Sequence, residues 1–154
     1  NELTSDQMME VMDQETTDEN CISIQSILTQ MVSSGYTYAV EVRKWLGEEI
    51  HYREKIALGE TREYTKALNE MFRFNEQLFE DYPTLNLCEH DPDKKINVSW
   101  GQKYDVEQLF EHAIVHILRH RRQIEKFKLK MDKREETAPF LNRFTPKSGN
   151  RPNK

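Results

Sequence analysis

Three stretches of this chain repeat apolar residues at intervals of three and four positions, which is the period of an amphipathic α-helix. The stretches cover residues 23–45, 61–81 and 105–131, and each is longer than a typical β-strand. In the first, the repeating positions are Ile24, Ile27, Leu28, Met31, Gly35, Tyr38, Ala39, Val42 and Leu46. Long amphipathic helices bury their apolar faces against one another, so the sequence predicts an all-α helical bundle.

Local signals mark where these helices begin and end. Pro83 lies just beyond the second stretch, and Asp105 with Gln108 resembles a capping box at the start of the third. Residues 3–14 contain enough apolar side chains for a short first helix. The sequence therefore predicts three firm helices preceded by a short one.

The segments between the helices are less regular. Within residues 85–103, Ile96 and Val98 alternate with polar neighbours, which predicts a short strand or hairpin ahead of the last helix. Residues 47–60 fit either an extension of a flanking helix or the connection between two helices. Gly35 lies on the inward face of its helix, where the missing side chain predicts a close approach by another backbone.

Length, charge and cysteine content limit the class of protein. A chain of 154 residues suits one domain with a single core. Its formal net charge of -5 argues against a nucleic-acid partner, because phosphate contacts need clustered lysine and arginine. No apolar run approaches the roughly 20 residues of a membrane span and no signal peptide is visible, so we expect a cytoplasmic protein without membrane contact. Cys21 and Cys88 lie far apart, and we expect them to be reduced thiols.

The end of the chain differs from the rest in composition. Residues 132–154 begin with a charged run and continue with three prolines, Pro139, Pro146 and Pro152. Such a composition predicts a mobile tail rather than a packed element. We therefore expect a helical domain over residues 1–131 followed by this tail.

Three histidines, His112, His116 and His120, recur every four residues on the last predicted helix. A four-residue step returns to nearly the same side of a helix, so the three side chains form one stripe at the border of the apolar face. Partial burial there lowers a histidine pKa and keeps the ring neutral, which is the form that binds metals. The alternative is that these histidines only hydrogen-bond to neighbouring helices or to water.

A matching polar stripe lies on the helix predicted over residues 23–45. Gln30, Ser34 and Tyr38 are also four residues apart, at the border of that helix's apolar face. If the two helices pack together, both stripes line one cleft. A transition-metal site needs a third protein ligand besides two histidines, and Gln30 offers only an amide oxygen, which binds zinc or nickel more weakly than imidazole does.

The string EHAIVHILRHRRQIEKF at residues 111–127 resembles the last-helix signature of DinB-like proteins. In that signature two histidines four residues apart are followed by arginine, a variable residue and glutamine. The matching residues here are His116, His120, Arg121 and Gln123.

A second part of the chain is similar to the same family. SIQSILTQM at residues 23–31 resembles the family's second-helix pattern of Ser-Ile, two variable residues, two aliphatic residues and a histidine two positions further on. The histidine position is occupied by Gln30 in this chain. With the order of the remaining elements, the resemblance covers residues 3–131.

This resemblance implies an up-and-down four-helix bundle, frequently dimeric, whose first helix is short or lies mostly upstream of Asn1. It also implies a divalent metal, zinc or nickel, held by three histidines from two helices. Those positions correspond here to His116, His120 and Gln30. His112 is a further candidate ligand, but His112 and His120 lie about 12 Å apart along the helix axis, which is too far for one ion without a bend.

Characterised DinB-like proteins include metal-dependent transferases that use a low-molecular-weight thiol. The resemblance therefore implies a thiol transferase acting on a small-molecule substrate, and we assign Tyr38, Arg121 and Gln123 to cofactor binding. No catalytic residue is identified. The alternative is a non-catalytic bundle that acts by forming a homodimer or by binding another partner.

Overall fold

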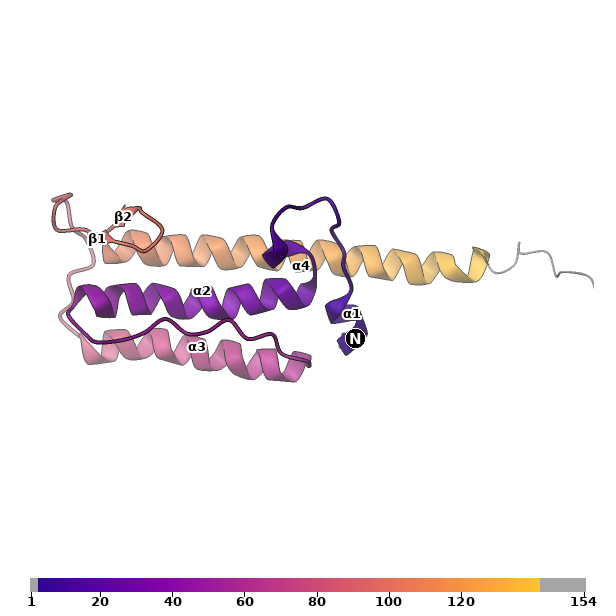
Figure 1. Cartoon of the computed structure of the whole chain (residues 1–154), viewed down its shortest axis with the longest axis horizontal. Coiled ribbons are helices and arrows are strands. Elements are labelled where there is room, and N and C mark those ends of the chain that lie inside the picture. Colours follow the sequence, from indigo (N-terminus) through magenta and orange to yellow (C-terminus); the bar gives the residue numbers. More distant parts are fainter. Residues whose placement is uncertain (1–2, 142–154) are drawn as a thin grey trace, which may run out of the picture.

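A computed structural model describes residues 3–141 of the chain, with side chains up to residue 136. Its long helices are α2 (Ile24–Trp45), α3 (Thr61–Asp81) and α4 (Val106–Leu141). The remaining elements are a short helix α1 (Ser5–Met9), a 3-10 turn η1 (Glu19–Cys21) and the antiparallel strands β1 (Ile96–Asn97) and β2 (Lys103–Tyr104). Figure 1 shows α2 between α3 and α4. The predicted all-α class, the short first helix and the hairpin before the last helix are confirmed.

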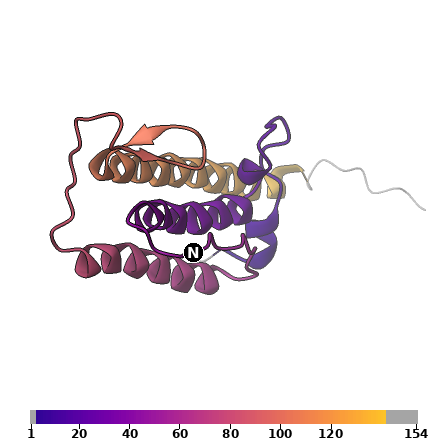
Figure 2. The ribbon, with the colours of Figure 1, turned by 60° about the vertical axis from the view of Figure 1, so that its left-hand side comes forward.

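The helices α2 and α3 run in the same direction. At their beginnings, the Tyr64 hydroxyl donates to the carbonyl of Gln25 over 3.2 Å. At their ends, Arg43 pairs with Asp81 at 2.7 Å. Residues 46–60 form an extended connection that returns along the bundle from the end of α2 to the start of α3 (Figures 1 and 2).

The predicted up-and-down order is therefore wrong at this connection. An up-and-down bundle joins antiparallel neighbours by short turns, whereas residues 46–60 contain no helix and are long enough to cross the whole bundle. The last residues of the connection are bonded to the beginning of α2, where Gln25 Nε2 donates a hydrogen bond to the Leu58 carbonyl at 2.9 Å. This bond, together with the buried Tyr64 ring, fixes α3 parallel to α2.

Two apolar clusters make up the core, and α2 contributes to both. One lies toward the hairpin and buries Tyr38, Ala39, Val42, Leu78, Ile96, Val98, Val106, Leu109 and Ala113. The other lies toward α1 and buries Met8, Met12, Ile24, Ile27, Met31, Tyr64, Phe127 and Met131. Among the described residues, no helix is both apolar and long enough for a membrane crossing.

Gly35 is packed more tightly than the other glycines in the described part of the chain. A Cβ built on it would lie 2.5 Å from Met71 Sδ on α3. The neighbour is thus a side chain rather than the backbone that the sequence predicted. The Gly35 carbonyl also accepts from Asn75 Nδ2 at 3.0 Å, so this site joins α2 to α3.

Helix α4 continues past the predicted end near residue 131 and reaches Leu141. The extension contacts α1, because Gln7 Nε2 donates to Glu135 Oε1 at 3.0 Å and Arg134 pairs with Glu10. The first part of the predicted tail is therefore helical. The rest of it, residues 142–154, lies outside the described residues.

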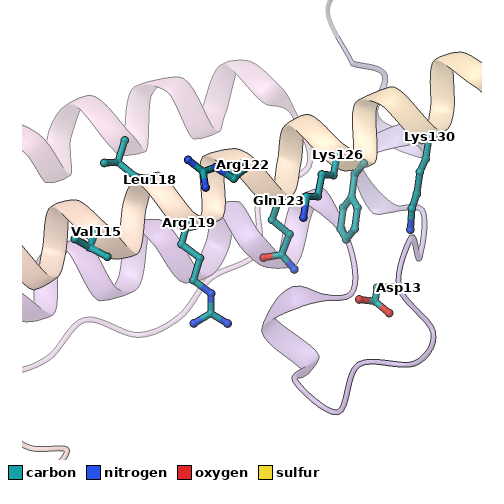
Figure 3. Close-up of a pocket in the computed structure, with 9 residues that line it drawn as sticks. Asp13, Val115, Leu118, Arg119, Arg122, Gln123, Lys126 and Lys130 are labelled. Carbon is teal, nitrogen blue, oxygen red and sulfur yellow. The ribbon is translucent and has the colours of Figure 1, made fainter.

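A groove of about 600 Å³ runs along one flank of α4 (Figure 3). Asp13, from the loop after α1, lies on its other side. The α4 side chains that line it are Val115, Leu118, Arg119, Arg122, Gln123, Lys126, Phe127 and Lys130. The groove therefore lies between α4 and the loop that follows α1.

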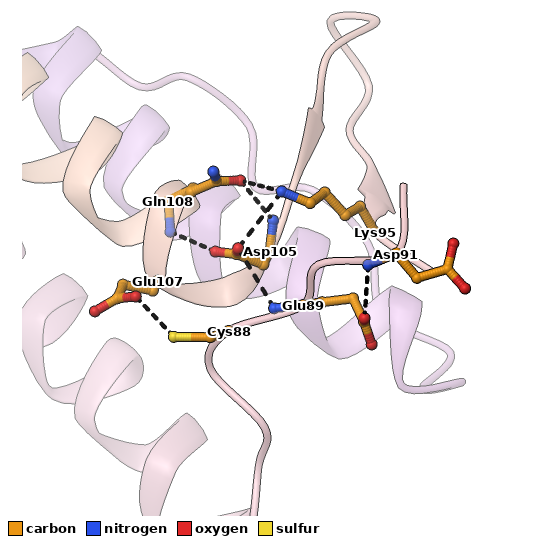
Figure 4. Close-up of polar contacts among 7 residues, drawn as sticks. All are labelled: Cys88, Glu89, Asp91, Lys95, Asp105, Glu107 and Gln108. Atoms are coloured by element: carbon orange, nitrogen blue, oxygen red, sulfur yellow. Dashed lines mark hydrogen bonds and ion pairs between the residues drawn. The ribbon is translucent and has the colours of Figure 1, made fainter. Parts of the chain in front are cut away.

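The start of α4 is fixed by the predicted capping box (Figure 4). Asp105 Oδ1 accepts from the backbone N–H of Gln108 at 2.8 Å, and Gln108 Oε1 accepts from the backbone N–H of Asp105 at 3.2 Å. Lys95 from the hairpin segment also pairs with Asp105, at 3.6 Å. These bonds satisfy free N–H groups of the first turn and join the hairpin to the helix that carries the histidines.

Candidate functional site

Two of the three histidines on α4 face each other. The Nε2 atoms of His116 and His120 are 3.0 Å apart, and the rings meet edge to face with centroids 4.4 Å apart. His120 is 4% exposed and His116 is partly buried. The stripe predicted from the sequence therefore contains a close pair.

Gln123 determines which nitrogen of His120 is protonated. Its Nε2 donates to the carbonyl of Cys21 at 3.4 Å, so its Oε1 is the atom that lies 3.3 Å from His120 Nδ1. An amide oxygen only accepts, which requires a hydrogen on His120 Nδ1 and leaves a lone pair on Nε2.

Both rings are held in the neutral form. Burial, followed by the nearby His120, His112 and Arg119, lowers the pKa of His116 from its ordinary value of 6.5 to about 4. Burial also lowers the pKa of His120. The prediction of neutral histidines at a core border therefore holds for His116 and His120, and neutral imidazole is the form that can bind a metal.

These shifts predict that the folded chain loses stability in mild acid. Between pH 6.5 and about 4, the unfolded chain binds a proton at residue 116 that the folded chain does not, so the free energy of unfolding falls as the pH drops through this range. We expect a loss of about 1–2 kcal/mol from this half-buried ring. Urea unfolding at several pH values should show a shallower fall for His116→Gln than for the original chain. An equal slope in both chains would contradict the assignment.

Helix α2 forms the opposite wall of the site and runs antiparallel to α4. Tyr38 lies beside His112, with ring centroids 5.9 Å apart, and Ser34 Oγ lies 3.4 Å from His116 Nδ1. One more helical turn back along α2 brings Gln30 level with His120. The two predicted stripes thus face each other in register.

A small pocket of about 310 Å³ opens between these walls. Its lining consists of Gln30, Ser33, Ser34, Thr37, Tyr38, Trp100, Gln102, His112 and His116. Tyr38 is buried, and burial followed by the nearby Tyr104 raises its pKa to about 12. The Tyr38 hydroxyl therefore stays protonated and can donate a hydrogen bond to a bound molecule.

Two residues predicted for the site lie apart from the histidine pair. His112 is exposed, and its Nδ1 lies 3.1 Å from the Tyr104 hydroxyl. Arg121 is also exposed and pairs with Glu125 at 2.9 Å. One residue advances the helix by about 100°, so Arg121 points away from the site although it follows His120 in the chain.

Other residues at the site were not predicted from the sequence. Trp100, at the hairpin, packs edge to face on Tyr38 with centroids 5.9 Å apart. Cys21, in η1, lies at the other end of the site, where its backbone carbonyl accepts a hydrogen bond from Gln123. Its thiol is free. Both residues come from segments outside α2 and the histidine stripe of α4, and no spacing in the sequence signals them.

The pair has the spacing of two ligands on one ion. With Zn–N bonds of 2.0–2.1 Å, two nitrogens separated by 3.0 Å subtend roughly 90–100° at the metal. No cluster of three or more His, Cys, Asp and Glu side chains suited to a metal occurs in the described part of the chain. The protein thus offers two imidazoles, with the Gln30 amide and water as the remaining oxygen donors.

Comparison with family models, with curated proteins and with solved structures finds no match to this chain. The described fold and site define a helical bundle with a close histidine pair, in which His120 is buried and His116 is partly buried. The likeness to DinB-like proteins continues to rest on the motifs around His116, His120 and residues 23–31.

Proposed function

We propose that this chain is a DinB-like protein that binds a divalent transition metal, zinc or nickel, through His116 and His120. The observation that carries the proposal is the 3.0 Å separation of the two Nε2 atoms in neutral, partly buried rings. A pair already at ligand spacing needs little rearrangement to bind an ion. Replacement of the third histidine by Gln30 predicts weaker binding than in a three-histidine site.

The residues around the pair have separate roles in this proposal. Gln123 orients His120 so that its Nε2 lone pair faces the site. Tyr38 positions a substrate group by donating a hydrogen bond, while Trp100 limits the entry of water to the pocket. A bound metal would lower the pKa of a low-molecular-weight thiol and favour the thiolate, which is the chemistry that a thiol transferase needs.

Titration with zinc and with nickel tests the proposal. Each ligand of a structural zinc site contributes about 2.5–4 kcal/mol, so two imidazoles are expected to give a Kd of about 1–200 μM. We expect His116→Ala and His120→Ala each to weaken binding by at least about tenfold, with calorimetry as the measurement. His51→Ala, at an exposed histidine of the 46–60 connection, is the matched control.

Equal binding by the original chain and both variants would place the metal elsewhere and contradict the proposal. A chain that binds neither ion at about 1 mM would contradict it as well.

A second candidate function is a non-catalytic bundle that acts through self-association. The observation in its favour is a group of exposed apolar side chains on α4, at Ile114, Val115 and Leu118. Contiguous exposed apolar surface commonly marks a protein interface. In this case the histidine pair only makes polar contacts between helices of the bundle, and His116→Ala changes the free energy of unfolding rather than any turnover.

A further inference from the structure

The side of α4 that faces away from the bundle carries an apolar centre. Ile114, Val115 and Leu118 are 58%, 65% and 52% exposed. At about 100° for each residue, the three side chains fall within roughly 100° of one another around the helix. They therefore form one continuous strip of water-exposed apolar surface, which we call the α4 outer face.

Charged side chains border this strip in a fixed order. Glu107 and Glu111 lie on the same side of the helix toward its beginning, and Arg122 and Lys126 lie toward its end. None of the four forms an ion pair with another described residue. The α4 outer face is thus acidic at one end, apolar in the middle and net basic at the other end, where the one acidic side chain, Glu125, is paired with Arg121.

This order is complementary to itself when a second copy of the helix is turned around. A two-fold axis midway between Val115 and Leu118 would set these two residues against each other across the interface. The same axis brings Glu111 opposite Arg122 of the partner subunit, and Arg122 opposite Glu111 of the partner subunit. The groove in Figure 3, which Val115, Leu118 and Arg122 also line, runs along this same part of α4.

We propose that two copies of this chain associate through their α4 outer faces in an antiparallel arrangement. The inference rests on the second candidate function and names its partner and its surface. A second copy fits better than a uniformly acidic or basic partner, because either would set like charges against one end of the strip. Antiparallel pairing covers the exposed apolar centre and satisfies both charged ends at once.

Charge reversal tests this pairing in solution. We expect the original chain to dimerise at about 100 μM, and Glu111→Arg or Arg122→Glu alone to raise the dimer dissociation constant about tenfold or more. The double variant exchanges the two charges and should return the dimer dissociation constant to within about threefold of the value for the original chain. Sedimentation velocity measures the constant, and circular dichroism checks that each variant is folded. Glu54→Arg, at an exposed residue of the 46–60 connection, is the matched control.

Three outcomes would contradict the proposed pairing, and they differ in whether self-association itself is retained. A dimer that neither single reversal weakens places the interface elsewhere, although self-association stands. If the single reversals weaken the dimer and the double variant does not restore it, the antiparallel alignment is excluded. A chain that is monomeric at about 100 μM overturns both the pairing and the second candidate function.

Discussion

Replacing Gln30 by histidine is expected to raise the affinity of the site for zinc by about 100-fold or more. Gln30 lies one helical turn from Ser34, whose Oγ is 3.4 Å from His116 Nδ1, and it lines the same pocket as His116. A third imidazole at this level completes the three nitrogens that a catalytic zinc site uses. At about 2.5–4 kcal/mol for each ligand, its addition corresponds to roughly 70- to 900-fold in Kd.

Calorimetric zinc titration of Gln30→His beside the original chain measures this gain. Lys44→His, which adds an exposed histidine at the far end of α2, controls for binding by any new imidazole. The gain should disappear when His116→Ala is combined with Gln30→His. Tight binding by Gln30→His with none by the original chain would mean that the natural site is degenerate. Binding by neither would remove the metal proposal.

The helices were predictable because their signals are local. Apolar spacing alone located residues 23–45 and 61–81 to within a residue, and the Asp105 capping box located the start of α4. The histidine pair was predictable for the same reason, since a four-residue step is a property of one helix. The burial that lowers the pKa of His116 also followed from its place beside the apolar face.

The features that could not be predicted depend on contacts between distant segments. The direction of α3 is set by Tyr64 and by the Arg43–Asp81 pair, and neither contact changes the apolar spacing within a helix. Trp100 joins the site only because the hairpin folds over α2. Arg121 shows the converse, because the sequence motif groups it with His120 whereas the helix turns it outward, where it pairs with Glu125.

Arg43→Met is expected to lower the free energy of unfolding by about 2–3 kcal/mol. The Arg43 side chain is 8% exposed and reaches two carboxylates, Glu48 at 2.9 Å and Asp81 at 2.7 Å. Its guanidinium also lies 5.3 Å from the centre of the Phe74 ring. Methionine fills much of the space but leaves both carboxylates without their cation. The loss is smaller than for a fully buried pair, because Glu48 and Asp81 are 31% and 40% exposed and remain partly hydrated.

Urea unfolding followed by circular dichroism measures the loss. Arg73→Met is the matched control, because its pair with Glu76 has the same 2.7 Å length but is mostly exposed, and such pairs contribute about 0–1 kcal/mol. The same small loss in both variants would mean that the Arg43 pair does not hold the ends of α2 and α3 together. A larger loss for Arg43 would link the parallel arrangement of these helices to one buried cation. That cation lies near the end of α2, just before the connection whose direction the apolar pattern could not predict.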